Sequence, residues 1–373
     1  MCHIYPHMAL SIGIVGLPNV GKSTLFNALT KAQNAQAANY PFCTIEPNKA
    51  TVAVPDKRVD ALTKKVNPKK TIYASVDFVD IAGLVRGASK GDGLGNQFLA
   101  TIRECAVIVH VVRCFEDVNI THVDGTISPL RDVETISTEL LLADIQSIEK
   151  RLEKLQKLAR SDKDAKVAFE IMQDLLKHLN NGEMASSFAL PDNDIFMQAW
   201  NEMGLMSAKP VIYCANVDEN GLNKENDYTK ELQKYAKVNN AQFVIICAKF
   251  EEELQSLSEI EQQEMCQAYG VEESGLVRVI QCGYSTLGLQ SYFTAGPDEV
   301  RAWTIHKGWK APQAAGVIHT DFAKGFIRAE VISYDDYMSH ESEAACRTDG
   351  VLRVEGKDYI VQDGDVMHFL FNV

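Results

Sequence analysis

The sequence predicts an α/β fold in three parts: a domain with a mostly parallel sheet, an antiparallel α-helical hairpin inserted into it, and a small C-terminal α+β module. Three observations predict this arrangement. In the first part, apolar runs typical of buried strands end in glycine-rich or polar loops. Leucine and isoleucine then recur at helical spacing between residues 141 and 159, and short alternating runs follow residue 283. The expected boundaries are 10–128 with 206–282 for the first domain, 129–205 for the hairpin and 283–373 for the module.

Composition narrows the class of protein. The chain has 373 residues, with 37 Lys and Arg against 50 Asp and Glu, and a net charge of −13. A protein this acidic binds nucleic acid only through a local basic patch. No run of about 18 apolar residues occurs and the first residues hold no basic run, so we expect neither a membrane span nor a signal peptide. Nine cysteines without a CxxC pair favour reduced thiols in a cytoplasmic protein.

The strongest motif is GLPNVGKS at 16–23, which fits the phosphate-binding pattern GxxxxGK[ST]. The apolar run 12–15 before it predicts a strand, and 24–29 after it predicts a helix. Glycines let backbone N–H groups surround a phosphate, and the helix N-terminus adds partial positive charge. We expect Lys22 to reach the β- and γ-phosphates. The predicted nucleotide contacts in this segment are Pro18, Asn19, Val20, Gly21, Lys22, Ser23 and Thr24.

Two further segments predict a magnesium site and a switch. An apolar strand ends in the DxxG pattern that runs from Asp80 to Gly83. Asp80 would hold Mg²⁺ through water, and the Gly83 N–H would face the γ-phosphate. Ser23 offers a hydroxyl to the same ion. Thr44 lies in a loop between the two motifs and would close over Mg²⁺ when the γ-phosphate is present; an ordinary loop threonine is the alternative. The predicted metal ligands are therefore Ser23, Thr44 and Asp80.

Two later strands end in polar turns that predict base-binding loops. The run 210–215 leads into the first turn and the run 244–247 into the second. Ligands of open α/β sheets bind at the carboxyl ends of the strands, so both turns should border the nucleotide. The predicted base contacts are Asn216, Val217, Glu219, Ala248 and Lys249.

The order of these motifs resembles that of the Obg superfamily of translation-factor-like G domains and, more narrowly, of the YchF or Obg-like ATPase family. The segments that carry the narrower resemblance are GLPNVGKST, NYPFCTIEPN, DIAGLVRGASKGDGLGNQFL, HVVRCF and NVDE. The resemblance covers essentially the whole chain. It implies a P-loop nucleoside triphosphatase that associates with the ribosome.

The base-reading turn departs from the NKxD pattern with which most G domains read guanine. Val217 replaces the lysine, and Glu219, one methylene longer, replaces the aspartate. A site built to pair the guanine N–H groups loses much affinity when its acceptor is misplaced. In the resembling family this departure accompanies a preference for ATP, so we expect ATP to be preferred over GTP. The alternative is that Asp218 or Glu219 still reads guanine after a small shift.

Leu84 stands where Ras-like proteins carry the glutamine that orients the attacking water. An aliphatic side chain cannot orient water, so another group must act. Three sources stay open: K⁺ bound with the help of Asn19, as in related G domains; His122, which is otherwise a surface loop histidine; or a ribosomal or protein partner. The predicted catalytic residues are Lys22, Thr44, Gly83 and His122. Five glycines between residues 83 and 95 predict a segment that is mobile without nucleotide and ordered by the γ-phosphate.

The segment 129–205 predicts an antiparallel helical hairpin. One helix has apolar residues at steps of four and three, at Leu141, Ile145, Ile148, Leu152, Leu155 and Ala159. The next has them at steps of four, at Val167, Ile171, Leu175 and Leu179. Residues 160–164 form the predicted turn, and a short helix around 194–203 leads back. A dense basic stretch would contact RNA or be a solvated helix face; its members are Lys150, Arg151, Lys154, Lys157, Arg160, Lys163 and Lys166.

The C-terminal segment predicts a small mixed sheet. Alternating runs occur at 286–289, 302–306, 351–354, 359–361 and 366–371, with short helices expected at 312–318 and 333–341. The segments FTAG, WTI, KGF and DGDV resemble the TGS domain, a ubiquitin-like β-grasp module. Lys310, Lys324 and Arg328 beside Phe322 and Phe326 would form a contact face for RNA or protein, unless the aromatic side chains fill the small core, which we favour.

The sequence therefore predicts a cytoplasmic, monomeric P-loop nucleotide hydrolase that uses Mg²⁺, and K⁺ if Asn19 binds it, and prefers ATP over GTP. It would act as a switch associated with the ribosome or with structured RNA and would not bind membranes. A GTPase of the Obg class is one alternative. The other is a nucleotide-gated module that binds RNA or protein and hydrolyses nucleotide only incidentally, as Leu84 suggests.

Overall fold

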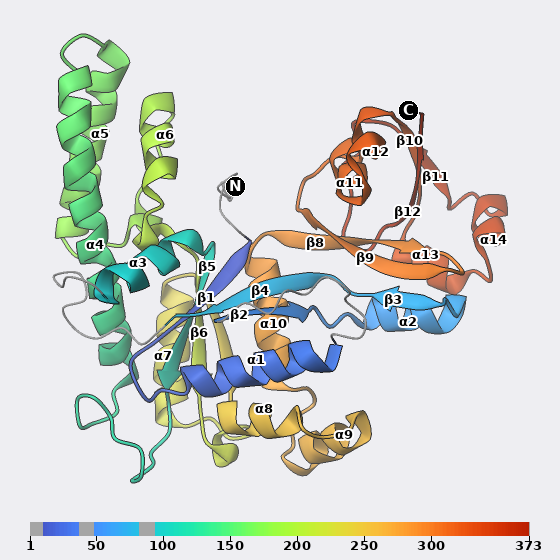
Figure 1. Cartoon of the computed structure of the whole chain (residues 1–373), viewed down its shortest axis with the longest axis horizontal. Coiled ribbons are helices and arrows are strands. Elements are labelled where there is room, and N and C mark those ends of the chain that lie inside the picture. Colours follow the sequence, from blue (N-terminus) through green and yellow to red (C-terminus); the bar gives the residue numbers. More distant parts are fainter. Residues whose placement is uncertain (1–9, 37–47, 82–93, 373) are drawn as a thin grey trace.

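The computed structural model describes residues 10–36, 48–81 and 94–372 (Figure 1). The described strands form two six-stranded sheets. The first sheet has the order β2-β4-β1-β5-β6-β7 and is parallel except for the pair β2–β4. Its strands are β1 (Ser11–Val15), β2 (Lys49–Ala53), β4 (Ser75–Asp80), β5 (Val107–Arg113), β6 (Val211–Asn216) and β7 (Gln242–Ile246). The predicted mostly parallel sheet is thus confirmed.

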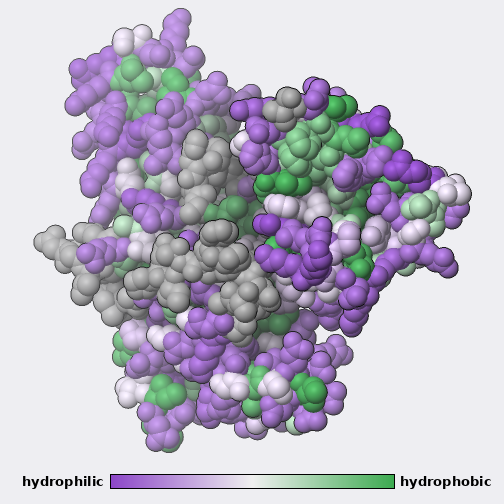
Figure 2. Space-filling view, turned by 45° about the vertical axis from the view of Figure 1, so that its right-hand side comes forward, coloured by the Kyte–Doolittle hydropathy of each residue, from purple (hydrophilic) through white to green (hydrophobic). Residues whose placement is uncertain are grey.

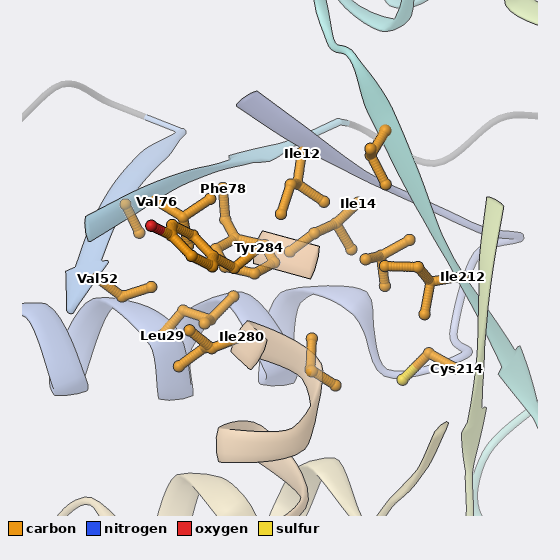
Figure 3. Packing of buried hydrophobic residues seen from close by; sticks show 14 of the residues in the cluster. Ile12, Ile14, Leu29, Val52, Val76, Phe78, Ile212, Cys214, Ile280 and Tyr284 are labelled. Atoms are coloured by element: carbon orange, nitrogen blue, oxygen red, sulfur yellow. The ribbon is translucent and has the colours of Figure 1, made fainter. Parts of the chain in front are cut away.

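Helices α1 (Lys22–Gln36) and α10 (Gly275–Thr286) pack against this sheet. Leu29 of α1 and Ile280 of α10 join Ile12, Ile14 and Phe78 of the strands in one cluster (Figure 3). Every residue of β1 and of β5 is buried, as expected for central parallel strands covered on both faces. The other helices here are α3 (Leu94–Glu104), α7 (Asp227–Val238), α8 (Ala248–Leu254) and α9 (Glu259–Ala268), with a 3₁₀ turn at Glu219–Gly221.

Helices α4 (Pro129–Leu158) and α5 (Lys163–Asn180) form the hairpin, and α6 (Asp194–Met203) packs beside them (Figure 1). Three predicted seam residues of α4, Leu141, Ile148 and Leu155, are buried against α5. The expectation for Val167 is wrong, because this residue is 46 % exposed. The buried residues of α5 are Ala165, Ala168, Met172, Leu175 and Leu179, so small side chains let α5 approach α4 closely near the turn.

A buried carboxylate fixes the base of the hairpin. Asp144 on α4 accepts hydrogen bonds from the backbone N–H groups of Met206 (3.0 Å) and Ser207 (2.7 Å), and from the Ser207 hydroxyl (2.6 Å). Burial raises the pKa of Asp144, and these three donors oppose the shift. The chain therefore returns to the sheet at a fixed point, through a 3₁₀ turn at Met206–Ala208 that follows an earlier one at Ala185–Ser187.

The second sheet has the order β11-β10-β12-β8-β9-β3. Its strands are β3 (Lys70–Ile72), β8 (Leu289–Ala295), β9 (Glu299–His306), β10 (Phe326–Ile332), β11 (Arg353–Glu355) and β12 (Val366–Phe371). Its helices are α11 (Ala311–Ile318), α12 (Thr320–Lys324), α13 (Tyr334–Ser339) and α14 (Glu343–Thr348). The parallel pair β8–β12 joins the antiparallel pairs β8–β9 and β10–β12. The expected α+β module is present, although the run 286–289 begins as the last residue of α10 rather than as a strand.

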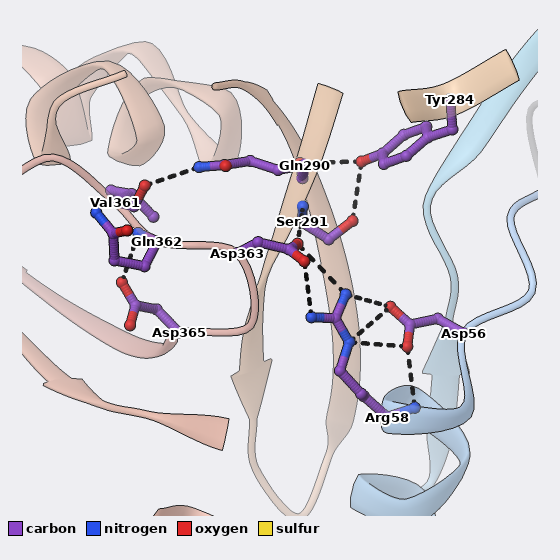
Figure 4. A network of polar contacts seen from close by, with 9 residues as sticks. All are labelled: Asp56, Arg58, Tyr284, Gln290, Ser291, Val361, Gln362, Asp363 and Asp365. Carbon is purple, nitrogen blue, oxygen red and sulfur yellow. Dashed lines mark hydrogen bonds and ion pairs between the residues drawn. The ribbon is translucent and has the colours of Figure 1, made fainter. Parts of the chain in front are cut away.

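Several contacts attach this module to the first domain, among them a strand pair and a bridging guanidinium. Strand β3, from the N-terminal part of the chain, pairs in parallel with β9. Arg58, on α2 (Lys57–Val66), donates from Nη2 to Asp56 (2.8 Å) and from Nη1 to Asp363 (2.9 Å) (Figure 4). Asp363 also accepts from the Ser291 N–H (3.0 Å). A strand pair and a bridging guanidinium therefore hold the two sheets together, which the predicted boundary at 282/283 did not anticipate.

The seven cysteines that the structure describes are all free, and six of them are buried. No helix within the described ranges is long and apolar enough to cross a membrane.

Candidate nucleotide-binding site

The loop 16–21 joins β1 to α1, and two of its glycines are required by close approach. A Cβ atom on Gly16 would lie 2.5 Å from the Val111 carbonyl oxygen of β5. Gly21 has φ +100°, and a Cβ atom there would lie 2.2 Å from Asn216 Nδ2 at the end of β6. Neither position tolerates a side chain. The glycines of the motif therefore hold the loop against two neighbouring strands as well as leaving room for a phosphate.

Lys22, the first residue of α1, and Asp80, the last residue of β4, form the charged centre of the site. Lys22 Nζ donates to the Leu17 carbonyl oxygen at 2.7 Å, and Lys22 is only 7 % exposed. Burial lowers the pKa of Lys22 to about 8, and the nearby Asp80 opposes that shift. Burial likewise raises the pKa of Asp80, against the effect of Lys22. Asp80 Oδ1 is buried and has no hydrogen-bond partner among the described residues, which suits a cation or its bound water.

Asn216 connects the phosphate-binding loop to the second base-binding turn. Its Nδ2 donates to the Val20 carbonyl oxygen at 2.9 Å, and its Oδ1 accepts from the Ala248 N–H at 2.9 Å. Asn216 is 4 % exposed, Val20 is 1 % exposed and Ala248 is 2 % exposed. Both ends of the amide are thus bound to backbone groups. Asn216 acts here as a positioning residue, whereas the sequence analysis expected it to meet the base.

The acidic residues of the first base-binding turn are both bonded within the protein. Asp218 Oδ1 accepts from the Gly221 N–H at 3.0 Å. Glu219 accepts from Lys249 Nζ at 3.0 Å. A hydrogen bond from its own backbone N–H, and after it the bond from Lys249, lowers the pKa of the Glu219 carboxyl. Val217 is 2 % exposed and its N–H donates to the Ile246 carbonyl oxygen at 2.8 Å. The predicted base contacts therefore gather at the ends of β6 and β7.

The remaining predicted contacts are distributed around the loop. Ser23 is exposed in the first turn of α1, while Pro18 and Thr24 are half-buried. Asn19 has φ +61°, and its Nδ2 donates to the Thr121 carbonyl oxygen at 3.2 Å. Thr44, Gly83 and Leu84 lie outside the described residues, as does nearly all of the glycine-rich segment 83–95.

Comparison with known proteins decides the family. A family model described as "50S ribosome-binding GTPase" matches residues 11–169, and the YchF GTPase C-terminal model, described as "Protein of unknown function (DUF933)", matches 289–372. The ribosome-binding ATPase YchF of Pasteurella multocida is 54 % identical over 367 residues, which is 98 % of this chain and 100 % of the relative. The chain belongs to the YchF family. The corresponding protein of Bacillus subtilis is 50 % identical over 369 residues, with the same coverage.

A solved structure agrees with this assignment to the YchF family. The Schizosaccharomyces pombe YchF GTPase is similar with a TM-score of 0.88 and 40 % identity, over 98 % of both chains. The resemblance inferred from the motifs is therefore confirmed over the whole length. The P-loop fold that it implied is confirmed as well.

Arg113 is a functional candidate that sequence reasoning missed in this YchF-family chain. It is 1 % exposed, and every hydrogen bond of its guanidinium to described residues goes to a backbone carbonyl oxygen. Its guanidinium donates to the carbonyl oxygens of Phe115 (3.1 Å), Ile120 (2.9 Å) and Asp117 (3.2 Å). The loop after β5 is thus wrapped around a buried cation. Because Thr121 of this loop accepts from Asn19, Arg113 fixes the loop that borders the phosphate-binding segment.

His122 is buried rather than on the surface, so that alternative is wrong. Its Nε2 lies 2.9 Å from Asp132 Oδ2, and its Nδ1 accepts from the Asp124 N–H at 3.2 Å. Because Nδ1 accepts a hydrogen bond, Nε2 carries the ring proton and donates a hydrogen bond to Asp132. Both ring nitrogens are therefore occupied in this arrangement, and His122 would have to leave Asp132 before it could orient a water.

His110 on β5 is a second buried histidine, next to the phosphate-binding loop. It is 3 % exposed and pairs in register with Val15, the last residue of β1. Burial lowers its pKa to about 3, and Lys22 adds to the shift. His110 is therefore neutral at physiological pH, and Lys22 is the cation of the loop. The apolar strand around His110 gave no signal of this position in the sequence.

Proposed function

We propose that this YchF-family chain is a ribosome-binding nucleoside triphosphatase that prefers ATP over GTP. The observation that carries the proposal is a buried Lys22 that interacts electrostatically with Asp80 beside a glycine loop, while the buried Oδ1 of Asp80 has no hydrogen-bond partner among the described residues. The bacterial relatives are named as ribosome-binding ATPases, whereas the fission yeast protein is named as a GTPase. The family names therefore support the class of reaction, and the base-binding turn must decide the nucleotide.

Ser23 and Asp80 would hold Mg²⁺, with Thr44 completing the set. Mg²⁺ would neutralise charge on the β- and γ-phosphates. The orphaned Asp80 Oδ1 and the exposed hydroxyl of Ser23 fit an ion that prefers oxygen ligands and keeps several waters. The change Asp80→Asn removes the anionic ligand, and we expect Mg²⁺-dependent turnover to fall at least about 100-fold. If Asp80→Asn turned over nucleotide at the original rate, the assignment would be wrong.

Preference for ATP is supported by the occupied carboxylates of the first base-binding turn. Guanine recognition needs an acidic acceptor for its N1–H and N2–H₂ groups. Asp218 accepts from the Gly221 N–H and Glu219 from Lys249 Nζ, so each carboxylate would have to share or give up its present partner to receive guanine. Titration of ATP and GTP side by side should show tighter binding of ATP. The change Lys249→Ala removes the partner of Glu219 and should bring the dissociation constants of ATP and GTP closer together. The control Lys237→Ala replaces an exposed lysine on α7 and should leave both dissociation constants unchanged.

Because Leu84 cannot orient the attacking water, we propose two candidates for the group that does so, K⁺ bound near Asn19 and His122. Asn19 binds Thr121 through Nδ2, and its Oδ1 takes part in no hydrogen bond within the described part of the chain. Oδ1 is therefore available to K⁺, and exchange of K⁺ for Na⁺ should slow hydrolysis without weakening nucleotide binding. His122 is the second candidate. An unchanged turnover number in His122→Ala would exclude it, and K⁺ or a binding partner would then remain as the group that orients water.

Gly83 would sense the γ-phosphate through its N–H.

Ribosome or structured-RNA contact is proposed at the far end of the hairpin. Arg151 is bound to Glu202 at 2.8 Å, but the other cations of the basic stretch form no ion pair with described residues and are exposed. These unpaired cations are Lys150, Lys154, Lys157, Arg160, Lys163 and Lys166. Phosphate contacts would make binding strongly salt-dependent.

Cosedimentation with ribosomes tests this surface. Replacement of Lys154 and Lys157 by glutamate should weaken binding and reduce its dependence on salt, because two phosphate contacts are lost. The matched control replaces Lys234 and Lys237 on α7, which are also exposed but lie on a different helix. Equal losses of ribosome binding in both variants would indicate a bulk charge effect.

As a ribosome-associated protein the chain would be cytoplasmic, and we propose that it acts as a monomer.

A further inference from the structure

The loop between β5 and α4 contacts the phosphate-binding loop one residue before His122. The carbonyl oxygen of Thr121 accepts from Asn19 Nδ2 at 3.2 Å. Consecutive Cα atoms lie about 3.8 Å apart, so the backbone of His122 is close to this contact. The ring of His122 is bound elsewhere, because its Nε2 donates to Asp132 Oδ2 at 2.9 Å. The backbone of His122 therefore borders the phosphate-binding loop, while its ring is held by α4.

The hydrogen bond between His122 and Asp132, which we call the resting pair, is shielded from water. The side chain of His122 is 4 % exposed and that of Asp132 is 2 % exposed. Asp132 lies in the first turn of α4, at the end of this helix that is lower in Figure 1. The hairpin at the other end of α4 has a mostly hydrophilic surface, at the upper left of Figure 2. Because water does not compete for the resting pair, another protein group must replace His122 before the ring can leave.

Asp132 needs such a replacement, since its carboxyl is buried. Burial raises the pKa of Asp132, and the bond to His122 opposes this shift. The second oxygen of the carboxyl, Oδ1, is buried and accepts no hydrogen bond from the described residues. A buried polar group without a partner destabilises the arrangement that contains it. The departure of His122 would leave both oxygens of Asp132 in that state.

Arg131 lies in the right place to take over the carboxyl. Its Nη2 is 3.9 Å from Asp132 Oδ1, which is too long for a hydrogen bond but within reach of a small shift. Hydrogen bonds from Nη1 and Nη2 to Thr126 hold the guanidinium at this position. A guanidinium carries five N–H donors, so Nη2 has a second hydrogen available for Asp132. The structure therefore contains both the resting pair and the group that can replace His122 in it.

We propose that Asp132 is a positioning residue that holds His122 in a resting position, and that hydrolysis requires His122 to move from Asp132 to the phosphate-binding loop while Arg131 binds the carboxyl. The inference rests on the proposed function, because it takes His122 as the group that orients the attacking water. A nucleotide in the phosphate-binding loop would favour release through Asn19, which contacts the residue before His122. The resting pair lowers the fraction of molecules that are ready to hydrolyse, so a weaker pair should give a faster enzyme.

Turnover of Mg·ATP by the full-length chain tests the resting pair. Asp132→Asn keeps an acceptor for Nε2 but removes the charge, and hydrogen bonds to neutral acceptors are weaker. We expect kcat to rise at least about threefold with KM unchanged, because the change weakens the resting position and not nucleotide binding. Glu134→Gln is the matched control, the same change from acid to amide at an exposed position of α4. It should leave kcat unchanged.

A double variant separates release of His122 from a general loosening of the loop. His122→Ala should lower kcat at least about tenfold, and Asp132→Asn should then produce no rise. If His122→Ala is slow but Asp132→Asn lowers kcat, leaves it unchanged or raises it no more than Glu134→Gln does, the resting pair is not inhibitory and the proposed function stands. If His122→Ala turns over ATP at the wild-type rate, the role of His122 in hydrolysis is wrong and the inference is wrong with it.

Nuclear magnetic resonance of the wild-type chain gives a test that needs no folded Asp132 variant. The Nε2–H of His122 should exchange slowly with water in the nucleotide-free chain, because it is buried and bound to Asp132. Loss of the resonance in His122→Ala assigns it. Addition of Mg²⁺ and a non-hydrolysable ATP analogue should make this proton exchange at least about tenfold faster. Unchanged exchange at saturating analogue would overturn the proposal.

Discussion

Removal of the Asn216 side chain tests how the nucleotide site is assembled. Asn216→Ala leaves two buried backbone groups without a partner, the Val20 carbonyl oxygen and the Ala248 N–H. Each unpaired group costs about 1–3 kcal/mol, so the two together cost about 2–6 kcal/mol. If this loss falls on the arrangement that binds nucleotide, the dissociation constant rises at least about 30-fold. Because Asn216 positions both loops, the rise should be similar for Mg·ATP, Mg·GTP and inorganic triphosphate.

The assay is titration of the three ligands against the wild type, Asn216→Ala and the control Asn220→Ala. Asn220 is exposed four residues further on, and its amide makes only a 3.4 Å contact with Asp218. The control should bind all three ligands as the wild type does. A selective loss of ATP affinity, with triphosphate binding unchanged, would refute this reasoning and show that Asn216 reads the base.

Three further predictions concern the phosphate-binding loop and the loop after β5. Lys22 has a folded pKa of about 8 against a usual value of 10.5, so its buried charge destabilises the free protein below pH 8 and this penalty is relieved between pH 8 and 10.5. A bound nucleotide keeps Lys22 protonated, so the protein should take up a proton when nucleotide binds at pH 9. Calorimetry in two buffers of different ionisation enthalpy measures this uptake. Gly21→Ala places a Cβ atom 2.2 Å from Asn216 Nδ2 and should weaken binding of both nucleotides about tenfold or more, while Gly356→Ala, which meets nothing within 4 Å, should have no effect. Arg113→Met removes three hydrogen bonds to carbonyl oxygens and should lower the free energy of unfolding by about 2–4 kcal/mol, with faster proteolysis between residues 115 and 122; an unchanged denaturation midpoint would contradict the role given to this guanidinium.

Elements with a local signal were predictable from the sequence. The strand, glycine loop and helix around 16–23 occur as expected, because the motif itself specifies the turn. The short helix at 194–203 has the expected bounds, since Asn193 caps its start and Gly204 follows its end in the left-handed conformation. Strand β3 could not be foreseen, because three residues carry no periodicity and their partner, β9, lies more than two hundred residues away. Val167 was misplaced because regular spacing shows which residues share a helix face but not which face its neighbour covers.

The candidate site was predictable as a set of residues but not as a set of roles. Motif spacing places Lys22 at the start of the helix after β1, Asp80 at the end of β4 and Asn216 at the end of β6, and the structure brings them to the same edge of the sheet. Spacing cannot tell that both ends of the Asn216 amide are bound to backbone groups. The burial of Arg113 and His122 was missed for a related reason. Their partners are carbonyl oxygens of a loop and the first turn of α4, and neither leaves a pattern in the sequence.

The pairing of β3 with β9 has a consequence for biosynthesis. Translation at 5–20 residues per second separates the two strands by roughly ten to fifty seconds. During that interval residues 70–72 wait for a neighbour that does not yet exist, while the first sheet can form around them. The C-terminal sheet is therefore completed only after nearly the whole polypeptide has emerged, and a fragment that starts at residue 283 would expose the edge of β9 as a template for aggregation.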